Sequence, residues 1–174
     1  MNSRIRIQLS TMMFFQFFIW GAWYVTFGTY LGALGHADFI GKAYSTIPLG
    51  AIVAPFIVGM IADRFFPAQR VIAVLHILGA GLLYWASTIT EPVYLFWVLV
   101  AYGIAYMPTL ALVNTIAFHQ MKESEKQFPA IRVLGTLGWI AAGLLIDWRD
   151  LESSAIPMRI AAGVSFLLGV FSDL

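Results

Sequence analysis

One apolar stretch of the sequence, residues 128–146, carries polar and aromatic side chains at helical spacing. Arg132, Thr136 and Trp139 follow one another at intervals of four and three residues, so a helix places them on one face. They offer a fork of N–H donors, a hydroxyl and a broad aromatic plane. An arginine in apolar surroundings tends to face protein or water and by default marks function. We therefore predict that this face binds a solute. The alternative is that Arg132 only extends from the end of the stretch to the membrane surface.

A second face of the same stretch is made of small residues. Gly135, Gly138 and Ala142 recur at helical spacing, and small residues allow two helix backbones to approach closely inside a membrane. A polar and aromatic face beside a small-residue face is what a solute pathway within a helix bundle requires. The stretch is therefore predicted to pack tightly against a neighbouring helix while its polar face stays available.

The composition indicates a membrane protein that crosses the bilayer several times. Hydrophobic residues make up 60% of the chain and charged residues 11%, with a mean hydropathy of +0.83. Soluble chains average about half apolar and about a quarter charged. The net charge of +1 gives no sign of a nucleic-acid partner. The absence of cysteine excludes disulfides, zinc–thiolate sites and thiol catalysis.

Apolar segments predict an all-α polytopic membrane helix bundle with six transmembrane helices. The basic residues Arg4 and Arg6 precede an apolar run, as in a signal peptide, but the run continues to about Leu34 and is interpreted as a retained first span. The predicted spans are about 9–34, 40–62, 71–87, 93–118, 128–146 and 157–174. The polar segment 119–127 is predicted to be a solvated loop.

The distribution of basic residues predicts a cytoplasmic N-terminus. With that orientation, the inner segments carry Arg4, Arg6, Arg64, Arg70, Lys122 and Lys126. The outer segments carry only Lys42, Arg149 and Arg159. Inner loops of membrane proteins are enriched in lysine and arginine, which favours this orientation and, with six spans, also a cytoplasmic C-terminus.

The turn after the second predicted span has a recognisable charge pattern. Gly59, Asp63 and Arg64 are followed by Arg70, and this arrangement resembles the signature loop of the major facilitator superfamily. It departs from the general pattern at residues 66–68, where Phe, Pro and Ala stand. The resemblance implies a conformational latch on the inner side. The alternative is an ordinary charged inner loop.

A closer resemblance is to one branch of that superfamily, the nucleoside:proton symporters. Three stretches carry it, FQFFIWGAW (15–23), AYMPTLALVNTI (105–116) and FPAIRVLGT (128–136). The resemblance extends over essentially the whole chain. It implies an alternating-access carrier of two six-helix halves around a midplane site, with this chain as the N-terminal half and the C-terminal half absent.

The resemblance also implies a function, a location and a set of site residues. Members move purine and pyrimidine nucleosides inward with a proton, which implies no cofactor besides that coupling ion. The expected partners are a nucleoside, the lipid bilayer of the cell (inner) membrane, and a missing C-terminal half or a second copy. Arg132, Thr136 and Trp139 match pocket positions of the family. Second-rank substrate-binding candidates are Gln16, Trp20 and Asn114.

Other functions are left open or weighed against. A different polar solute such as a sugar, and a non-transporting membrane subunit or scaffold, remain alternatives. His76 is interpreted as a packed, hydrogen-bonded histidine rather than a proton carrier. No buried aspartate or glutamate lies in the middle of a predicted span, so an acidic proton site is expected in the other half. The serines lack a histidine–acid partnership and no cluster has metal-ligand spacing, so we do not expect an enzyme.

Overall fold

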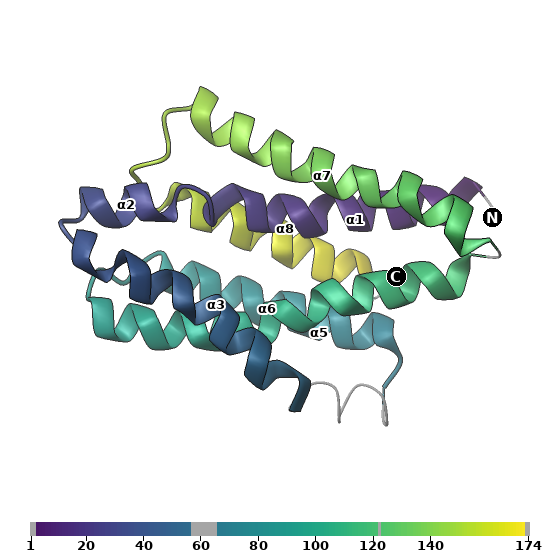
Figure 1. Ribbon diagram of the computed structural model, residues 1–174, viewed down its shortest axis with the longest axis horizontal. Coiled ribbons are helices and arrows are strands. Elements are labelled where there is room, and N and C mark those ends of the chain that lie inside the picture. Colours follow the sequence, from purple (N-terminus) through teal and green to yellow (C-terminus); the bar gives the residue numbers. More distant parts are fainter. Residues whose placement is uncertain (1–2, 57–65, 122, 173–174) are drawn as a thin grey trace.

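The computed structural model describes residues 3–56, 66–121 and 123–172, and throughout these residues the regular elements are helices. The helices lie side by side along the long axis of the molecule (Figure 1). In chain order they are α1 (Ser3–Trp23), α2 (Phe27–Ala33), the 3₁₀ helix η1 (Ala37–Phe39), α3 (Ile40–Ala54), α5 (Ala68–Ala86), α6 (Pro92–Gln120), α7 (Ser124–Trp148) and α8 (Ile156–Ser172).

Helix α1 contacts three of the other long helices. It packs against α7 and α8 along most of its length and also contacts α6. Helix α5 joins α6 to α8, and α3 packs on the opposite side of α6. The long helices alternate in direction, so α1, α5 and α7 begin at one end of the bundle and α3, α6 and α8 at the other (Figure 1).

The predicted first span, 9–34, is two helices in the structure. Helix α1 starts earlier, at Ser3, and ends at Trp23, and α2 resumes at Phe27. The break is stabilised from α3, where the Tyr44 hydroxyl donates to the Tyr24 carbonyl oxygen at 2.9 Å and accepts from the Gly28 N–H at 3.0 Å. Backbone groups freed inside an apolar bundle must find such partners, and one side chain of α3 supplies both bonds.

The later helices begin and end close to the predicted spans, with one correction. Residues 119–127, predicted to be a loop, largely belong to helix ends, because α6 continues to Gln120 and α7 begins at Ser124. An ion pair of 2.9 Å between Glu123 and Lys126 stabilises the start of α7, where both side chains are exposed. Residues 57–62 of the predicted second span lie outside the described residues.

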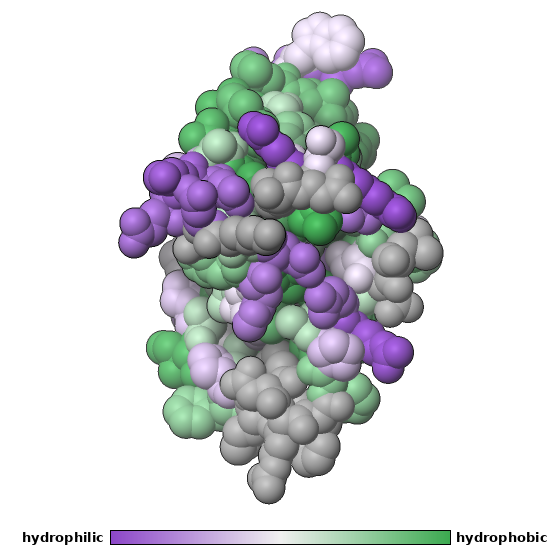
Figure 2. All heavy atoms as spheres, turned by 90° about the vertical axis from the view of Figure 1, so that its right-hand side faces the viewer, coloured by the Kyte–Doolittle hydropathy of each residue, from purple (hydrophilic) through white to green (hydrophobic). Residues whose placement is uncertain are grey.

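Three of the described helices are long and apolar enough to cross a membrane: Ala68–Ala86, Pro92–Gln120 and Glu125–Trp148. Ile156–Ser172 is apolar but shorter. Six transmembrane helices therefore remain a prediction. Figure 2 views the end of the bundle where α1 begins, where hydrophilic residues gather across the tip and hydrophobic residues cover the flanks.

The small-residue face of α7 packs against α1, as predicted. Gly135, Gly138 and Ala142 are all buried. A Cβ placed on Gly138 would collide with the carbonyl oxygen of Phe14 on α1. Glycine is therefore required there, because the two helix backbones are in direct contact.

Candidate functional site

Arg132 lies on α7 and is partly buried against α1. Its guanidinium carbon lies 4.1 Å from the centre of the Phe17 ring. A cation over an aromatic face is stabilised by about 0.5–2 kcal/mol, depending on how far it is desolvated. Within the part of the chain that the structure describes, the guanidinium has no hydrogen bond or ion pair with another side chain. Arg132 is therefore held in place by stacking while its N–H donors remain available.

Gly135 provides the space for this stacking. A Cβ at position 135 would lie 2.7 Å from the Phe17 ring and 2.8 Å from the nearer terminal nitrogen of Arg132. Both distances are shorter than the 3.0 Å below which Cβ contacts are essentially never found. The absence of a side chain at Gly135 thus lets the guanidinium fold back along its own helix onto the ring of the neighbouring one.

Trp139 and Thr136 continue the face of Arg132 toward the other end of α7. Trp139 is partly buried and packs edge-to-face on Trp20 of α1, with ring centroids 5.3 Å apart and an interplanar angle of 78°. Thr136 is exposed. The three residues predicted to share a face are therefore available on one side of α7, next to an aromatic pair formed with α1.

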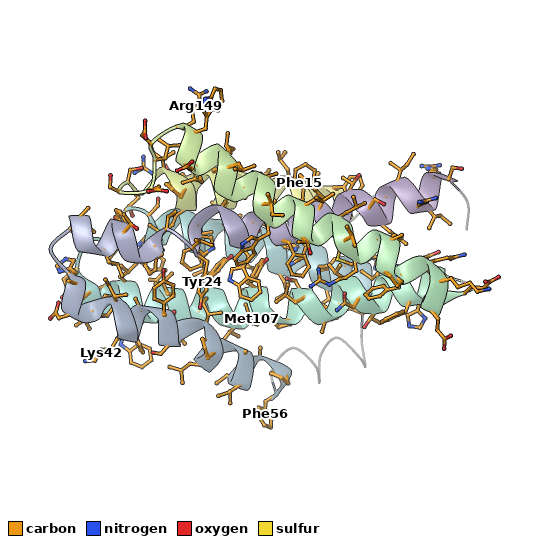
Figure 3. The ribbon with its side chains drawn as sticks, turned by 45° about the horizontal axis from the view of Figure 1, so that its top comes forward. Phe15, Tyr24, Lys42, Phe56, Met107 and Arg149 are labelled. Carbon is orange, nitrogen blue, oxygen red and sulfur yellow. The ribbon has the colours of Figure 1, made fainter. Side chains whose placement is uncertain are left out.

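Trp20 connects this face to α6. Its ring centroid lies 6.3 Å from that of Tyr106 on α6 and 5.6 Å from that of Tyr24. Figure 3 labels Tyr24 and, on α6, Met107, both in the central part of the bundle. The buried Trp20 Nε1 has no hydrogen-bond partner among the described residues. Trp20 therefore adds a free N–H donor to an aromatic surface that α6 and α7 share across α1.

Asn114 supplies an acceptor on the α6 side. Phe118 of α6 and Phe128 of α7 stack with centroids 4.4 Å apart, next to the short turn that joins these antiparallel helices. Asn114 is one turn before Phe118 and Arg132 is one turn after Phe128, so both lie at a similar height above the turn. The Oδ1 atom of Asn114 is buried and has no hydrogen-bond partner within the described residues. An unpaired buried acceptor in the same layer as a free guanidinium suits a ligand that has both donors and acceptors.

Gln16 occupies a different place from the other candidates. Its side chain is completely buried, and its carboxamide bonds to Thr109 Oγ1 and His76 Nε2, each at 2.8 Å. His76 in turn lies 3.0 Å from Ser165 Oγ through Nδ1. The interpretation of His76 as a packed, hydrogen-bonded residue is confirmed. Gln16 belongs to the contact between helices and is not exposed on the face of Arg132.

Two hollows among the described residues lie at the ends of the bundle, and neither is lined by Arg132, Thr136 or Trp139. One of about 450 Å³ is lined by η1, α3 and the start of α6, including Asp38, Lys42 and Trp97. The other, of about 330 Å³, is lined by α1, α5, α6 and α8, including Gln8 and Gln120. The face of Arg132 is open in the described residues, since Thr136 is exposed and Arg132 and Trp139 are only partly buried.

The predicted latch is described only in part. Gly59, Asp63 and Arg64 lie outside the described residues. Arg70 lies in the first turn of α5 and is exposed. Its role in a latch stays a prediction.

Two residues of the site were missed by the sequence analysis. Phe17, which stacks on Arg132, and Tyr106, which packs on Trp20, are ordinary aromatic residues in apolar runs. Each owes its role to a helix distant in sequence, and the helical spacing of one stretch does not identify its neighbours in space. Phe17 lies in the family-like stretch 15–23 and Tyr106 in the family-like stretch 105–116. Membership of these stretches is the sequence signal that could have identified them.

The chain is similar to known nucleoside transporters over nearly all of its length. Residues 1–173 match the family described as Nucleoside H+ symporter. The chain is 46% identical over 173 residues to the "Putative nucleoside transporter YegT" of Escherichia coli (strain K12), covering 95% of this chain and 41% of that protein. It is 37% identical over 174 residues to the "Xanthosine permease" of the same organism, covering 97% of this chain and 42% of the permease.

A solved structure supports the same grouping. The crystal structure of nucleoside transporter NupG superposes with a TM-score of 0.91 at 34% identity, covering 99% of this chain and 44% of that one. The chain thus spans about two fifths of the length of the curated relatives it matches. By its sequence and its fold, the chain belongs to the nucleoside H+ symporter family.

Proposed function

We propose that this chain forms the N-terminal half of a carrier that moves nucleosides across the membrane together with a proton. The observation that carries the proposal is the guanidinium of Arg132, which is partly buried, stacked on Phe17 and without a hydrogen-bond acceptor among the described residues. A partly buried cation with free donors is costly in a membrane protein and by default marks a functional site.

The surrounding groups match the parts of a nucleoside. The Trp20–Trp139 pair presents aromatic surface on which a planar base can stack. The Arg132 fork can donate to base carbonyl oxygens or ribose hydroxyls, and Asn114 Oδ1 can accept from an N–H or O–H group. A sugar shares the hydroxyls but not the planar base, so the aromatic pair favours a nucleoside over the sugar alternative.

The proposed architecture extends beyond the described residues. We place six spans in the cell inner membrane with a cytoplasmic N-terminus, Asp63 in an inner latch, and the rest of the solute site on a C-terminal half or a second copy. The alternating direction of the helices supports the up-and-down course that this requires. The open form of the Arg132 face supports a site that is completed by other residues. The coupling proton is assigned from the family alone.

The proposal is tested by uptake of radiolabelled uridine and adenosine into cells that express this chain alone or within the full-length carrier. Saturable uptake that a protonophore abolishes, and that unlabelled sugars do not compete for, is the expected result for the full-length protein. Competition of unlabelled sugars with the labelled nucleosides would instead support a sugar as the substrate. No uptake by a full-length protein that reaches the membrane would refute carrier function for these nucleosides and favour a non-transporting subunit.

A further inference from the structure

A buried polar cluster connects four helices beneath the Arg132 face. The Gln16 carboxamide of α1 lies at its centre, between Thr109 of α6 and His76 of α5, and Ser165 of α8 bonds to the far side of His76. The Tyr106 hydroxyl adds a bond to the backbone carbonyl oxygen of Gln16. These five side chains are at most 2% exposed. The cluster is not part of the solute face, yet every helix that packs on α1, except α7, contributes to it.

The direction of each bond follows from the number of protons available. Thr109 donates its hydroxyl proton to the carbonyl oxygen of Tyr106, so Thr109 Oγ1 can only accept from the Gln16 NH₂ group. The Gln16 oxygen therefore faces His76 Nε2 at 2.8 Å, and this contact is attractive only if Nε2 carries a proton. In a neutral ring Nδ1 is then an acceptor. The Ser165 hydroxyl has one proton and two acceptors within reach, Nδ1 at 3.0 Å and the His76 backbone carbonyl oxygen at 2.9 Å, and it can donate to either. The contact with Gln16 therefore selects the Nε2-protonated form of His76, whereas the contact with Ser165 is compatible with either form.

Gln16 lies within one turn of two residues of the solute face on α1. Phe17 is the next residue and lies under Arg132, and Trp20 is one turn further and packs on Trp139. A rotation of α1 about its axis would displace both rings together. Packing and hydrogen bonds set the rotation of helices in a bilayer, where lipid competes equally for apolar surfaces.

We propose that His76 is a positioning residue for solute binding. Its Nε2–H bond to Gln16 Oε1 fixes the rotation of α1 and thereby places Phe17 and Trp20 against α7. The proposal rests on the proposed function, because the Arg132 face is its endpoint. Without the bond, the carboxamide oxygen is left unpaired in an apolar interior, and α1 can settle in another rotation.

Two substitutions separate the two sides of the imidazole ring. In His76→Gln, the amide nitrogen takes the place of Nε2 and retains a donor toward Gln16. In His76→Asn, the shorter amide takes the place of Nδ1 and retains a contact with Ser165 only. For nucleoside uptake by the full-length carrier, we expect a KM within about threefold of the unsubstituted value for His76→Gln and at least about tenfold higher for His76→Asn, with a smaller change in maximal rate. The exposed His119→Gln serves as the matched control, without effect.

The pattern among these variants decides the proposal. Equal KM values for His76→Gln and His76→Asn would overturn it, because the bond to Gln16 would then not matter. Loss of protonophore-sensitive uptake in both, with nucleoside binding retained, would also overturn it and make His76 a proton carrier.

A second measurement does not depend on transport. The chain has three histidines, and ¹⁵N-histidine NMR of the chain in detergent, with His76 assigned by its absence in His76→Gln, reports which nitrogen is protonated. We expect Nε2–H, whereas Nδ1–H would overturn the assigned bond direction. If the unsubstituted carrier takes up no nucleoside, the proposed function is refuted. The NMR result would still show whether His76 donates a hydrogen bond to Gln16.

Discussion

Replacing Gly135 by alanine tests whether the stacked position of Arg132 matters for solute binding. The added Cβ would lie 2.7 Å from the Phe17 ring and 2.8 Å from Arg132, and both neighbours are side chains that can move. We therefore expect the substitution to displace the guanidinium rather than to separate α1 from α7. Alanine also favours the helix over glycine by about 1 kcal/mol, so the amount of folded protein should not fall.

The expected loss follows from two interactions. Displacement removes the stacking of Arg132 on Phe17, worth about 0.5–1 kcal/mol for a partly exposed pair. It also weakens a charge-assisted hydrogen bond to the solute, worth about 1.5–3 kcal/mol. If the stacking is lost completely and the hydrogen bond is only lengthened, the loss of binding free energy is about 2 kcal/mol. This corresponds to roughly thirtyfold weaker binding of the solute.

The assay is saturable uptake or binding of labelled nucleoside by the full-length carrier, normalised to the amount in the membrane. Gly143→Ala on the same helix is the matched control, since a Cβ there would meet nothing within 4 Å and gives the same gain in helix propensity. An unchanged KM in Gly135→Ala, at a normal membrane level, would refute the view that the stacked arginine contacts the solute.

Substitutions at Arg132, Trp139 and Tyr44 test three further predictions. Arg132→Ala should abolish saturable uptake without lowering the amount of carrier in the membrane. Arg132→Lys should retain only part of the uptake, because an ammonium lacks the planar donor fork. Normal uptake by Arg132→Ala would show that this residue is not part of the site. Trp139→Leu should weaken nucleoside binding by about 1–3 kcal/mol, which is the usual cost of losing the stacking of a base on an aromatic side chain. Trp139→Phe should retain most of the affinity. Equal affinities of the Trp139→Leu and Trp139→Phe carriers would exclude stacking at this position. Tyr44→Phe should destabilise the detergent-solubilised chain by about 1–2 kcal/mol in thermal unfolding, because the break between α1 and α2 loses two hydrogen bonds. The exposed Tyr84→Phe should leave stability unchanged, and an equal effect of both tyrosine substitutions would contradict this reasoning.

The apolar runs predicted the later helices well and the first one incompletely. Helices α5, α6, α7 and α8 begin and end within about a turn of the predicted spans, and most of the extra residues, such as those at 119–120 and 124–127, are polar. The break at Tyr24–Thr26 contains neither proline nor glycine, so no local signal indicated it. It depends on the hydroxyl of Tyr44, which reaches it from another helix.

The site was predictable as far as a single helix determines it. Helical spacing alone put Arg132, Thr136 and Trp139 on one side of α7 and the glycines on another. The partner of Arg132 was not predictable, because it depends on which helix packs on α7 and at what height. Gln16 shows the same limit. A polar residue in an apolar run can face either a solute pathway or a neighbouring helix, and the sequence does not distinguish the two. The positions of Thr109 and His76 show that Gln16 faces neighbouring helices.

The close contact at Gly138 bears on how affinity can differ between the two sides of a membrane. With the backbones of α1 and α7 touching there, the two helices cannot move closer together without a collision at the Phe14 carbonyl, and the contact resists sliding of one along the other. We therefore expect Phe17 and Arg132 to move together when a carrier changes conformation, and their contribution to binding to be similar in each state. A carrier built on this pair has to obtain any difference between uptake and release from groups that approach it, such as those of α6 or of the other half, and not from the arginine itself.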